Sequence, residues 1–235
     1  DNAKLSKRNG EVSIAWYREQ GYLPEAICNY LALLGWSPGD DRENISMQEL
    51  TELFTVEKVH SSPARFDMKK LEAINGDKIR ALSLEEFAHW TLPFLTKAGV
   101  ISGTDGEIAL VKKALPLIQE RIVKLDEAPQ LLKFLFVKEF AVDADAVSKI
   151  ADASAKDILK RSLADLEGVA TWNHESIEAV LRASLIEVLG LKPRIAFTAL
   201  RIATTGSTIS PPLFESMELL GKEACLARIS QALAL

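Results

Sequence analysis

The sequence predicts an all-α protein. Apolar residues recur at helical spacing in segment after segment, prolines open and glycines close several of these segments, and no convincing pair of strands appears. Short alternating stretches such as residues 11–14 are too brief to establish a sheet. With 48% hydrophobic and 26% charged residues, the 235-residue chain has a globular composition and can bury one large core or two to three smaller ones.

The expected helices follow one another along the whole chain. One opens at Pro24 and ends before Gly35, and the next covers residues 46–54, where Ser46 and Glu49 form a capping-box pattern. Further helices are expected over residues 64–75, 84–97, 105–125, 128–137, 143–151, 155–167, 174–189, 193–203, 212–220 and 222–235. Two weak seams, near residues 81–84 and 140–145, divide the chain into expected segments 1–82, 83–142 and 143–235.

The cysteines and histidines argue against a metal site. Cys28 and Cys225 lie among apolar residues at helical spacing, which predicts reduced core thiols. His60, His89 and His174 are scattered, whereas a zinc cluster needs about four ligands at close spacing. No apolar run reaches the roughly 20 residues of a membrane span, and no apolar signal region opens the sequence. We expect a cytoplasmic protein, or one from an organelle interior if a targeting segment has been removed.

The charge balance is mildly unfavourable for nucleic-acid binding. The formal net charge is -5 and the pI is about 5.4, whereas a phosphate partner usually selects a basic face. The net charge of the whole chain does not describe its individual faces, so a local basic surface is still compatible with the sequence. The acidity equally supports a second hypothesis, a helical interaction or regulatory module that binds protein and no RNA.

A basic pentapeptide, Lys4-Leu5-Ser6-Lys7-Arg8, stands near the start of the sequence. Two lysines on a solvated loop can place ammonium groups on a polyphosphate, where phosphoryl and adenylyl transfer need positive charge. A basic run of this length is more often only a solvated face. The surrounding sequence decides between these interpretations.

The pentapeptide resembles the KMSKS signature of class I aminoacyl-tRNA synthetases, in the KLSKR form common in glutamyl enzymes. Further blocks match in order and spacing: YREQGYLPEA at 17–26, NYLALLGWS at 29–37, SPARFD at 62–67, residues 70–71 and 75–76, the run 193–206, SPPLFE at 210–215, and residues 219–223 and 228–229. Together they resemble the bacterial-type glutamyl-tRNA synthetase family over almost the whole chain. Asn9 departs from that pattern, as do Ala73 and Lys78.

The resemblance implies a C-terminal portion of such an enzyme. Residues 1–82 would form the KMSKS-type loop and a helical stem-contact region, and residues 83–142 and 143–235 a two-part helical anticodon-binding module. None of the histidines stands in the HIGH-type motif of the nucleotide-binding fold, so the chain alone is expected to be inactive. The implied partner is glutamate tRNA, with no DNA and no membrane, and the chain is expected to be a monomer.

The resemblance also assigns roles to the pentapeptide. Lys7 would approach the ATP phosphates during glutamate activation, Lys4 would support the loop, and Leu5, Ser6 and Arg8 would complete it. The intact enzyme would use ATP with Mg²⁺. The chain alone is expected to bind no cofactor and no metal.

Two basic clusters are the candidate tRNA contacts. In residues 109–125, a helix would place Lys113, Arg121 and Lys124 opposite an apolar stripe. Exposed bases of RNA loops stack on guanidinium planes and are read through their edges, so such a face fits an anticodon loop. The second cluster is Lys192, Arg194 and Arg201, near the small polar residues 204–208. Ordinary solubility of a basic face, or an ordinary polar turn, is the competing interpretation.

Overall fold

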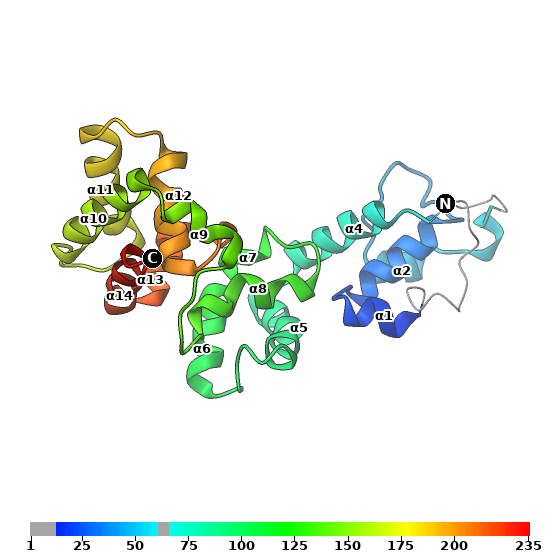
Figure 1. Cartoon of the computed structure of the whole chain (residues 1–235). Helices are drawn as coiled ribbons and strands as arrows, with labels where there is room; N and C mark the ends of the chain where they lie inside the picture. The colour runs from blue at the N-terminus through cyan, green and yellow to red at the C-terminus, as the bar shows by residue number, and fades with distance from the viewer. Residues whose placement is uncertain (1–12, 61–65) are drawn as a thin grey trace. The chain divides into compact units, whose positions relative to one another are not determined.

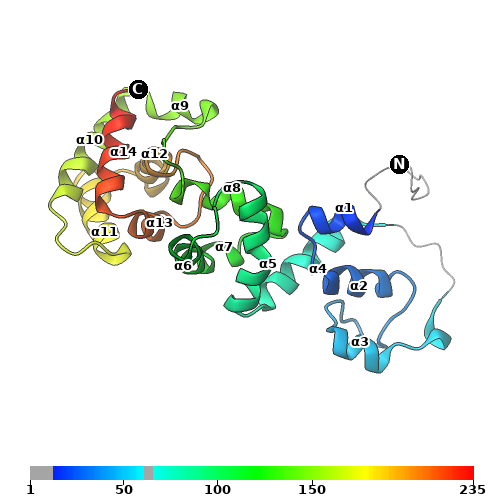
Figure 2. The ribbon, with the colours of Figure 1, turned by 90° about the horizontal axis from the view of Figure 1, so that it is seen from below.

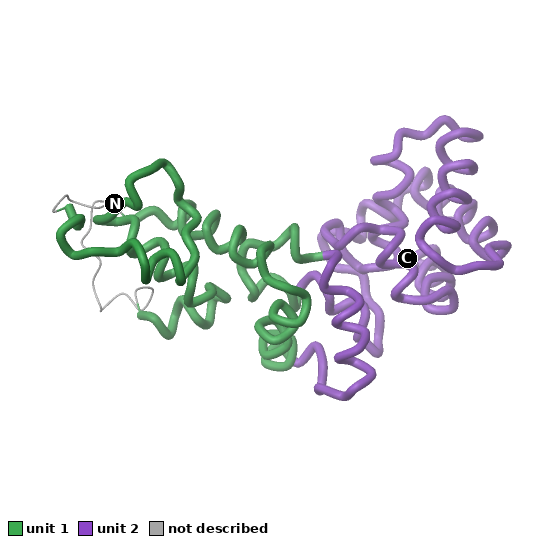
Figure 3. Tube along the Cα trace, turned by 180° about the vertical axis from the view of Figure 1, so that it is seen from behind, with its two compact units in different colours: residues 1–98, 118–129 green, residues 99–117, 130–235 purple. Residues whose placement is uncertain are grey.

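The computed structural model describes residues 13–60 and 66–235 (Figure 1). In these ranges the chain is helical and contains no strand, so the all-α prediction is confirmed. The chain folds into two compact units: residues 1–98 with 118–129, and residues 99–117 with 130–235 (Figure 3). None of the helices in the described ranges has the length and apolar character that crossing a membrane requires.

Unit 1 is built around the pairing of α2 with α4, and α3 packs on α2. Its helices are α1 (Ile14–Glu19), α2 (Pro24–Leu33), α3 (Met47–Leu53), η2 (Val56–Lys58), α4 (Met68–Ala81), α5 (Leu84–Lys97) and η3 (Leu125–Glu127). The predicted capping box of α3 is present, because the Ser46 side chain accepts from the Glu49 N–H and the Glu49 side chain accepts from the Ser46 N–H. The α1 helix was not predicted.

The predicted bounds of α4 are wrong at both ends. Asp67 caps the helix by accepting from the N–H groups of Lys69 and Lys70, and the helix runs past residue 75 to Ala81. Gly76 lies inside the helix, where a Cβ would come 3.1 Å from Val123 Cγ1. The glycine therefore allows close packing.

The single helix expected over residues 105–125 is interrupted. Helix α6 (Asp105–Ala114) ends before Pro116, and a short α7 (Pro116–Gln119) leads into a turn. Proline has no N–H to donate to the preceding turn and crowds it, so the apolar periodicity continues through a break in the helix. After α8 (Ala128–Leu132) comes the 3₁₀ turn η4 (Lys133–Leu135).

Unit 2 holds a core of helices in which α10 packs on α12 and α14, and α11 packs on α13 (Figure 2). These elements are α9 (Ala144–Ile150), α10 (Ala153–Glu167), α11 (His174–Leu181) with the π-helical turn η5 (Arg182–Val188), α12 (Pro193–Thr205), α13 (Leu213–Leu220) and α14 (Lys222–Leu233). Leu159, Leu181, Leu200 and Ile229 are fully buried between them.

The two cysteines differ in burial. Cys225 is buried in the core of unit 2, where burial raises the pKa of its thiol to about 12, and both cysteines are free thiols. Cys28 is exposed on α2, so the prediction that it is a core residue is wrong. Among the described residues, no group of histidine, cysteine, aspartate and glutamate could hold a metal ion.

Candidate nucleic-acid interface

Helix α12 presents the N-terminal part of the second predicted basic cluster. Pro193 occupies its first turn, where a missing N–H costs nothing, and Lys192 stands at the N-cap without a capping side chain. Ala196, Ala199 and Leu200 face the core, while Lys192 and Arg194 are exposed. Both side chains are therefore available to a partner.

Unlike Lys192 and Arg194, Arg201 is engaged in hydrogen bonds within the protein. Its Nη1 donates to the carbonyls of Ser210, at 3.4 Å, and Pro211, at 2.8 Å, and also bonds the Ser210 hydroxyl. The seven-residue spacing from Arg194 suggested one common binding face, but Arg201 is half-buried and holds the chain between α12 and α13. A tRNA contact by Arg201 stays a prediction, and its observed role is to position residues 210–211.

Beside Arg194, a cavity of about 260 Å³ opens where α9, α10 and α12 meet. Lys149 lines it from the last turn of α9, Ser154 and Ile158 from α10, and Ile195 from α12. The sequence did not single out Lys149, because it is distant from Arg194 in sequence and becomes its neighbour only when the three helices pack.

The first predicted cluster does not form one helix face. Lys113 lies in the last turn of α6, Arg121 in the turn after α7, and Lys124 at the start of η3. Lys113 belongs to unit 2, whereas Arg121 and Lys124 belong to unit 1. The prediction of a common face is therefore wrong, and the reason is the break at Pro116. A tRNA contact by each residue stays a prediction.

The three side chains also differ in their surroundings. Lys113 and Arg121 are exposed. Lys124 is half-buried, and its Nζ lies 3.7 Å from a carboxylate oxygen of Asp126. Of the three, Lys113 and Arg121 are the more accessible to a ligand.

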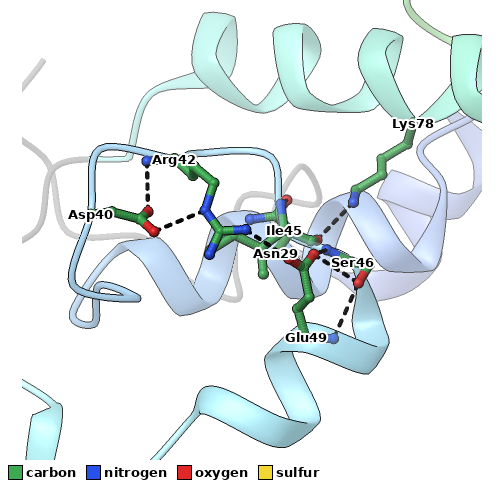
Figure 4. A network of polar contacts seen from close by, with 7 residues as sticks. All are labelled: Asn29, Asp40, Arg42, Ile45, Ser46, Glu49 and Lys78. Carbon is green, nitrogen blue, oxygen red and sulfur yellow. Dashed lines mark hydrogen bonds and ion pairs between the residues drawn. The ribbon is translucent and has the colours of Figure 1, made fainter.

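The pentapeptide formed by Lys4, Leu5, Ser6, Lys7 and Arg8 lies outside the described residues. In the described part of unit 1, a polar network fixes the loop between α2 and α3 (Figure 4). The buried Asn29 accepts from the Ile45 N–H at 2.9 Å and donates to the Glu43 carbonyl at 3.0 Å. Lys78 reaches across from α4 and donates to the Ile45 carbonyl at 2.7 Å.

Lys78 is only 8% exposed, and burial lowers the pKa of its ammonium group. At the outer side of the same loop, Arg42 bonds Asp40 at 2.9 Å and Glu49 at 2.7 Å (Figure 4). Hydrogen bonds from Ser46, followed by the one from Arg42, lower the pKa of Glu49 to about 2. The network thus connects the loop to α2, α3 and α4, and Lys78, a departure from the resembled pattern, acts as part of the scaffold.

Comparison with protein-family models gives two matches that together cover most of the chain. Residues 1–73 match the catalytic domain of class I tRNA synthetases (E and Q), and residues 84–233 match the anticodon binding domain. The chain belongs to the anticodon-binding domain family. The resemblance found in the sequence is confirmed.

Individual relatives agree with this anticodon-binding family assignment. The glutamate–tRNA ligases of Nocardioides sp. and Leifsonia xyli are each 47% identical to the chain, over 236 and 233 residues, covering 99% and 97% of it and 48% of each relative. A crystal structure of a glutamate tRNA ligase from Elizabethkingia meningosepticum, in complex with its amino acid, superposes with a TM-score of 0.81 at 27% identity. It covers all of the chain and 49% of that protein. The chain thus spans about half the length of these relatives.

Proposed function

We propose that the chain is the tRNA-recognition part of a glutamate–tRNA ligase. The observation that carries the proposal is the match of residues 84–233 to the anticodon binding domain, within a chain that is similar along its length to glutamate–tRNA ligases. Residues 1–82 contact the tRNA stem, and residues 83–142 and 143–235 bind the anticodon loop. The protein acts in the cytoplasm as a monomer.

The proposed contacts follow from the charged residues. Lys113 and Arg121, both exposed, and Lys192 and Arg194 on α12 meet the RNA, with Lys124 and Arg201 in supporting positions. In the intact enzyme, Lys7 contacts the ATP phosphates and Lys4 supports the loop. In the intact enzyme, Mg²⁺ would enter together with ATP.

The chain alone is proposed to be inactive. A loop lysine stabilises developing phosphate charge only when ATP is already held in position. Glutamate-dependent exchange between ATP and pyrophosphate should therefore stay at background with the chain alone. Exchange above background would contradict this part of the proposal.

The main test is binding of glutamate tRNA at two salt concentrations. Contacts to phosphates release counterions, so the affinity should fall as the salt concentration rises. The second candidate function, a protein-interaction module, is favoured by the net charge of -5. It predicts no measurable tRNA binding at either concentration.

A further inference from the structure

A cavity lies where α9, α10 and α12 meet, and cationic and apolar side chains both line it. Its volume is about 260 Å³, slightly below the range of about 300–1,000 Å³ typical of small-molecule pockets. Such a space admits one planar ring with its substituents and excludes a large cofactor. All of its lining residues belong to unit 2 and are described by the structure.

Two cationic side chains reach the cavity from different helices. Lys149 extends from α9 and Arg194 from α12, and both are exposed. Neither makes an ion pair in the part of the chain that the structure describes. Their charges are therefore available to an anion in or beside the cavity, because no ion pair among the described residues engages either group.

One carboxylate, that of Asp152, also lines the cavity and already accepts hydrogen bonds within the protein. Asp152 caps α10: its side chain accepts from the Ser154 N–H at 3.3 Å and from the Ser154 hydroxyl at 2.5 Å. These bonds lower the pKa of Asp152, so it stays ionised and committed to the helix end. The lining residues thus carry two positive charges and one negative charge.

Four of the lining residues are apolar. Ala155, Ile158 and Ala199 are buried, and Ile195 has 53% of its surface exposed. The Thr198 hydroxyl donates to the Arg194 carbonyl at 2.6 Å. An exposed isoleucine in a cavity that two cations also line provides an apolar contact for a ligand that carries negative charge.

A nucleotide of unpaired RNA has both properties. Its base is a flat ring whose faces can pack against apolar surface, and its phosphate is an anion. Proteins bind such nucleotides by combining a packing surface with positive charge. We propose that this cavity binds one unpaired nucleotide of an RNA loop, with the base against Ile158 and Ile195 and the adjoining phosphates on Lys149 and Arg194. The inference rests on the proposed function for the identity of the RNA, a tRNA.

The first experiment separates these two cations from the general charge of the protein. Affinities for a glutamate tRNA transcript and for a seven-nucleotide single-stranded RNA are measured over a salt series, with the full chain and with Lys149→Gln and Arg194→Gln. Each variant should bind both RNAs about threefold to tenfold more weakly, with a salt slope lower by roughly 0.7–0.9.

A matched control removes the same charge elsewhere on the same unit. Lys160→Gln changes an exposed lysine on α10 that lies 3.9 Å from Asp157 and does not line the cavity. It should leave affinity and slope close to those of the unmodified chain. Equal effects of Lys149→Gln, Arg194→Gln and Lys160→Gln would overturn the proposed site.

Two further variants test the base contact. Arg194→Lys keeps the charge but removes the planar group, and Ile195→Ala removes the exposed apolar wall. Both should weaken binding about threefold or more while leaving the salt slope unchanged. Because both residues are exposed, thermal unfolding of each variant should match that of the unmodified chain, which separates loss of contact from loss of fold.

The outcomes distinguish the site from the proposed function. Binding of the short RNA through Lys149 and Arg194 without binding of the tRNA supports the site and refutes the tRNA partner. If the tRNA binds and neither Lys149→Gln nor Arg194→Gln changes its affinity, the proposed site is refuted but tRNA remains the proposed partner. No binding of either RNA refutes both, and stronger competition by a phosphopeptide of equal charge refutes RNA as the occupant.

Discussion

The guanidinium carbon of Arg228 lies 4.4 Å from the centroid of the Phe140 ring, inside unit 2. Arg228 is 8% exposed, and its two terminal nitrogens donate to the carbonyls of Thr204, at 2.8 Å, and Phe134, at 2.9 Å. Arg228 of α14 is thereby hydrogen-bonded to the end of α12 and to the segment that leads into α9. The buried Arg228 is therefore a structural clamp of unit 2.

Replacing this clamp should weaken the fold. Arg228→Met keeps much of the volume but leaves the carbonyls of Phe134 and Thr204 without their charged donor. The free energy of unfolding should fall by about 3 kcal/mol, as measured by urea denaturation. The control is Arg182→Met, which removes a partly exposed arginine 5.6 Å from the Phe197 ring and should cost less than about 1 kcal/mol. Equal losses in both variants would contradict the clamp.

A second prediction concerns Asn75, a buried residue of α4. Its Oδ1 accepts from the Leu23 N–H at 2.8 Å, and its Nδ2 donates to the carbonyls of Val123, at 2.6 Å, and Gly21, at 3.3 Å. Asn75→Asp retains the acceptor but sets a carboxylate against two carbonyls. The free energy of unfolding should fall by about 3 kcal/mol, measured by urea denaturation at neutral pH.

The control for this change is Asn173→Asp. Asn173 caps α11, where its side-chain oxygen only accepts, from the Ser176 N–H at 2.9 Å. Aspartate is an equally good cap and favours the helix dipole, so stability should change by less than about 0.5 kcal/mol. A small effect at position 75 would show that the amide donors of Asn75 are dispensable.

The pair of His174 and Glu218 predicts a pH dependence. His174 Nδ1 lies 2.6 Å from Glu218 Oε2, and this contact raises the pKa of the imidazole above its usual 6.5 and lowers that of the carboxyl. The stabilisation by charged His174 is therefore fully present below pH 6.5 and is lost as the pH rises through the higher, folded-state pKa.

The measurement is thermal unfolding from pH 5.5 to 8.5. The unmodified chain should lose stability relative to His174→Gln across this interval, most steeply just above pH 6.5. His89→Gln is the control, because His89 makes no ion pair among the described residues. A constant difference between the unmodified chain and His174→Gln over the whole pH range would contradict the prediction.

Local signals in the sequence predicted local structure well. The bounds of α5 (84–97) agree with the expected helix, and the capping box at Ser46 and the proline start of α12 are present. Each depends on residues within one turn of one another. Where an apolar stripe continued across Pro116, the periodicity predicted one helix that the structure divides. The helix expected over residues 64–75 likewise has other bounds in the structure.

The candidate site was harder to predict, because it depends on contacts between distant segments. Arg201 and Arg194 look equivalent in sequence, yet only the packing of residues 210–211 against α12 commits Arg201 to a structural role. Lys149 enters the site from a different helix, and Cys28 lies on the exposed side of α2. These distinctions become visible only when the helices are assembled.

The last prediction compares two exposed cations of the proposed tRNA interface. Arg121 lies in a turn, so its planar guanidinium can stack on or bond a base without disturbing a core, whereas Lys113 offers a point charge at the end of α6. Arg121→Ala should weaken binding of glutamate tRNA by about 1–3 kcal/mol and narrow its advantage over an anticodon-swapped tRNA. Lys113→Ala should weaken both tRNAs alike and reduce the salt slope, as loss of a phosphate contact does. Affinities of both tRNAs at two salt concentrations provide the comparison, and an unchanged ratio between the tRNAs in Arg121→Ala would mean that Arg121 does not read the anticodon.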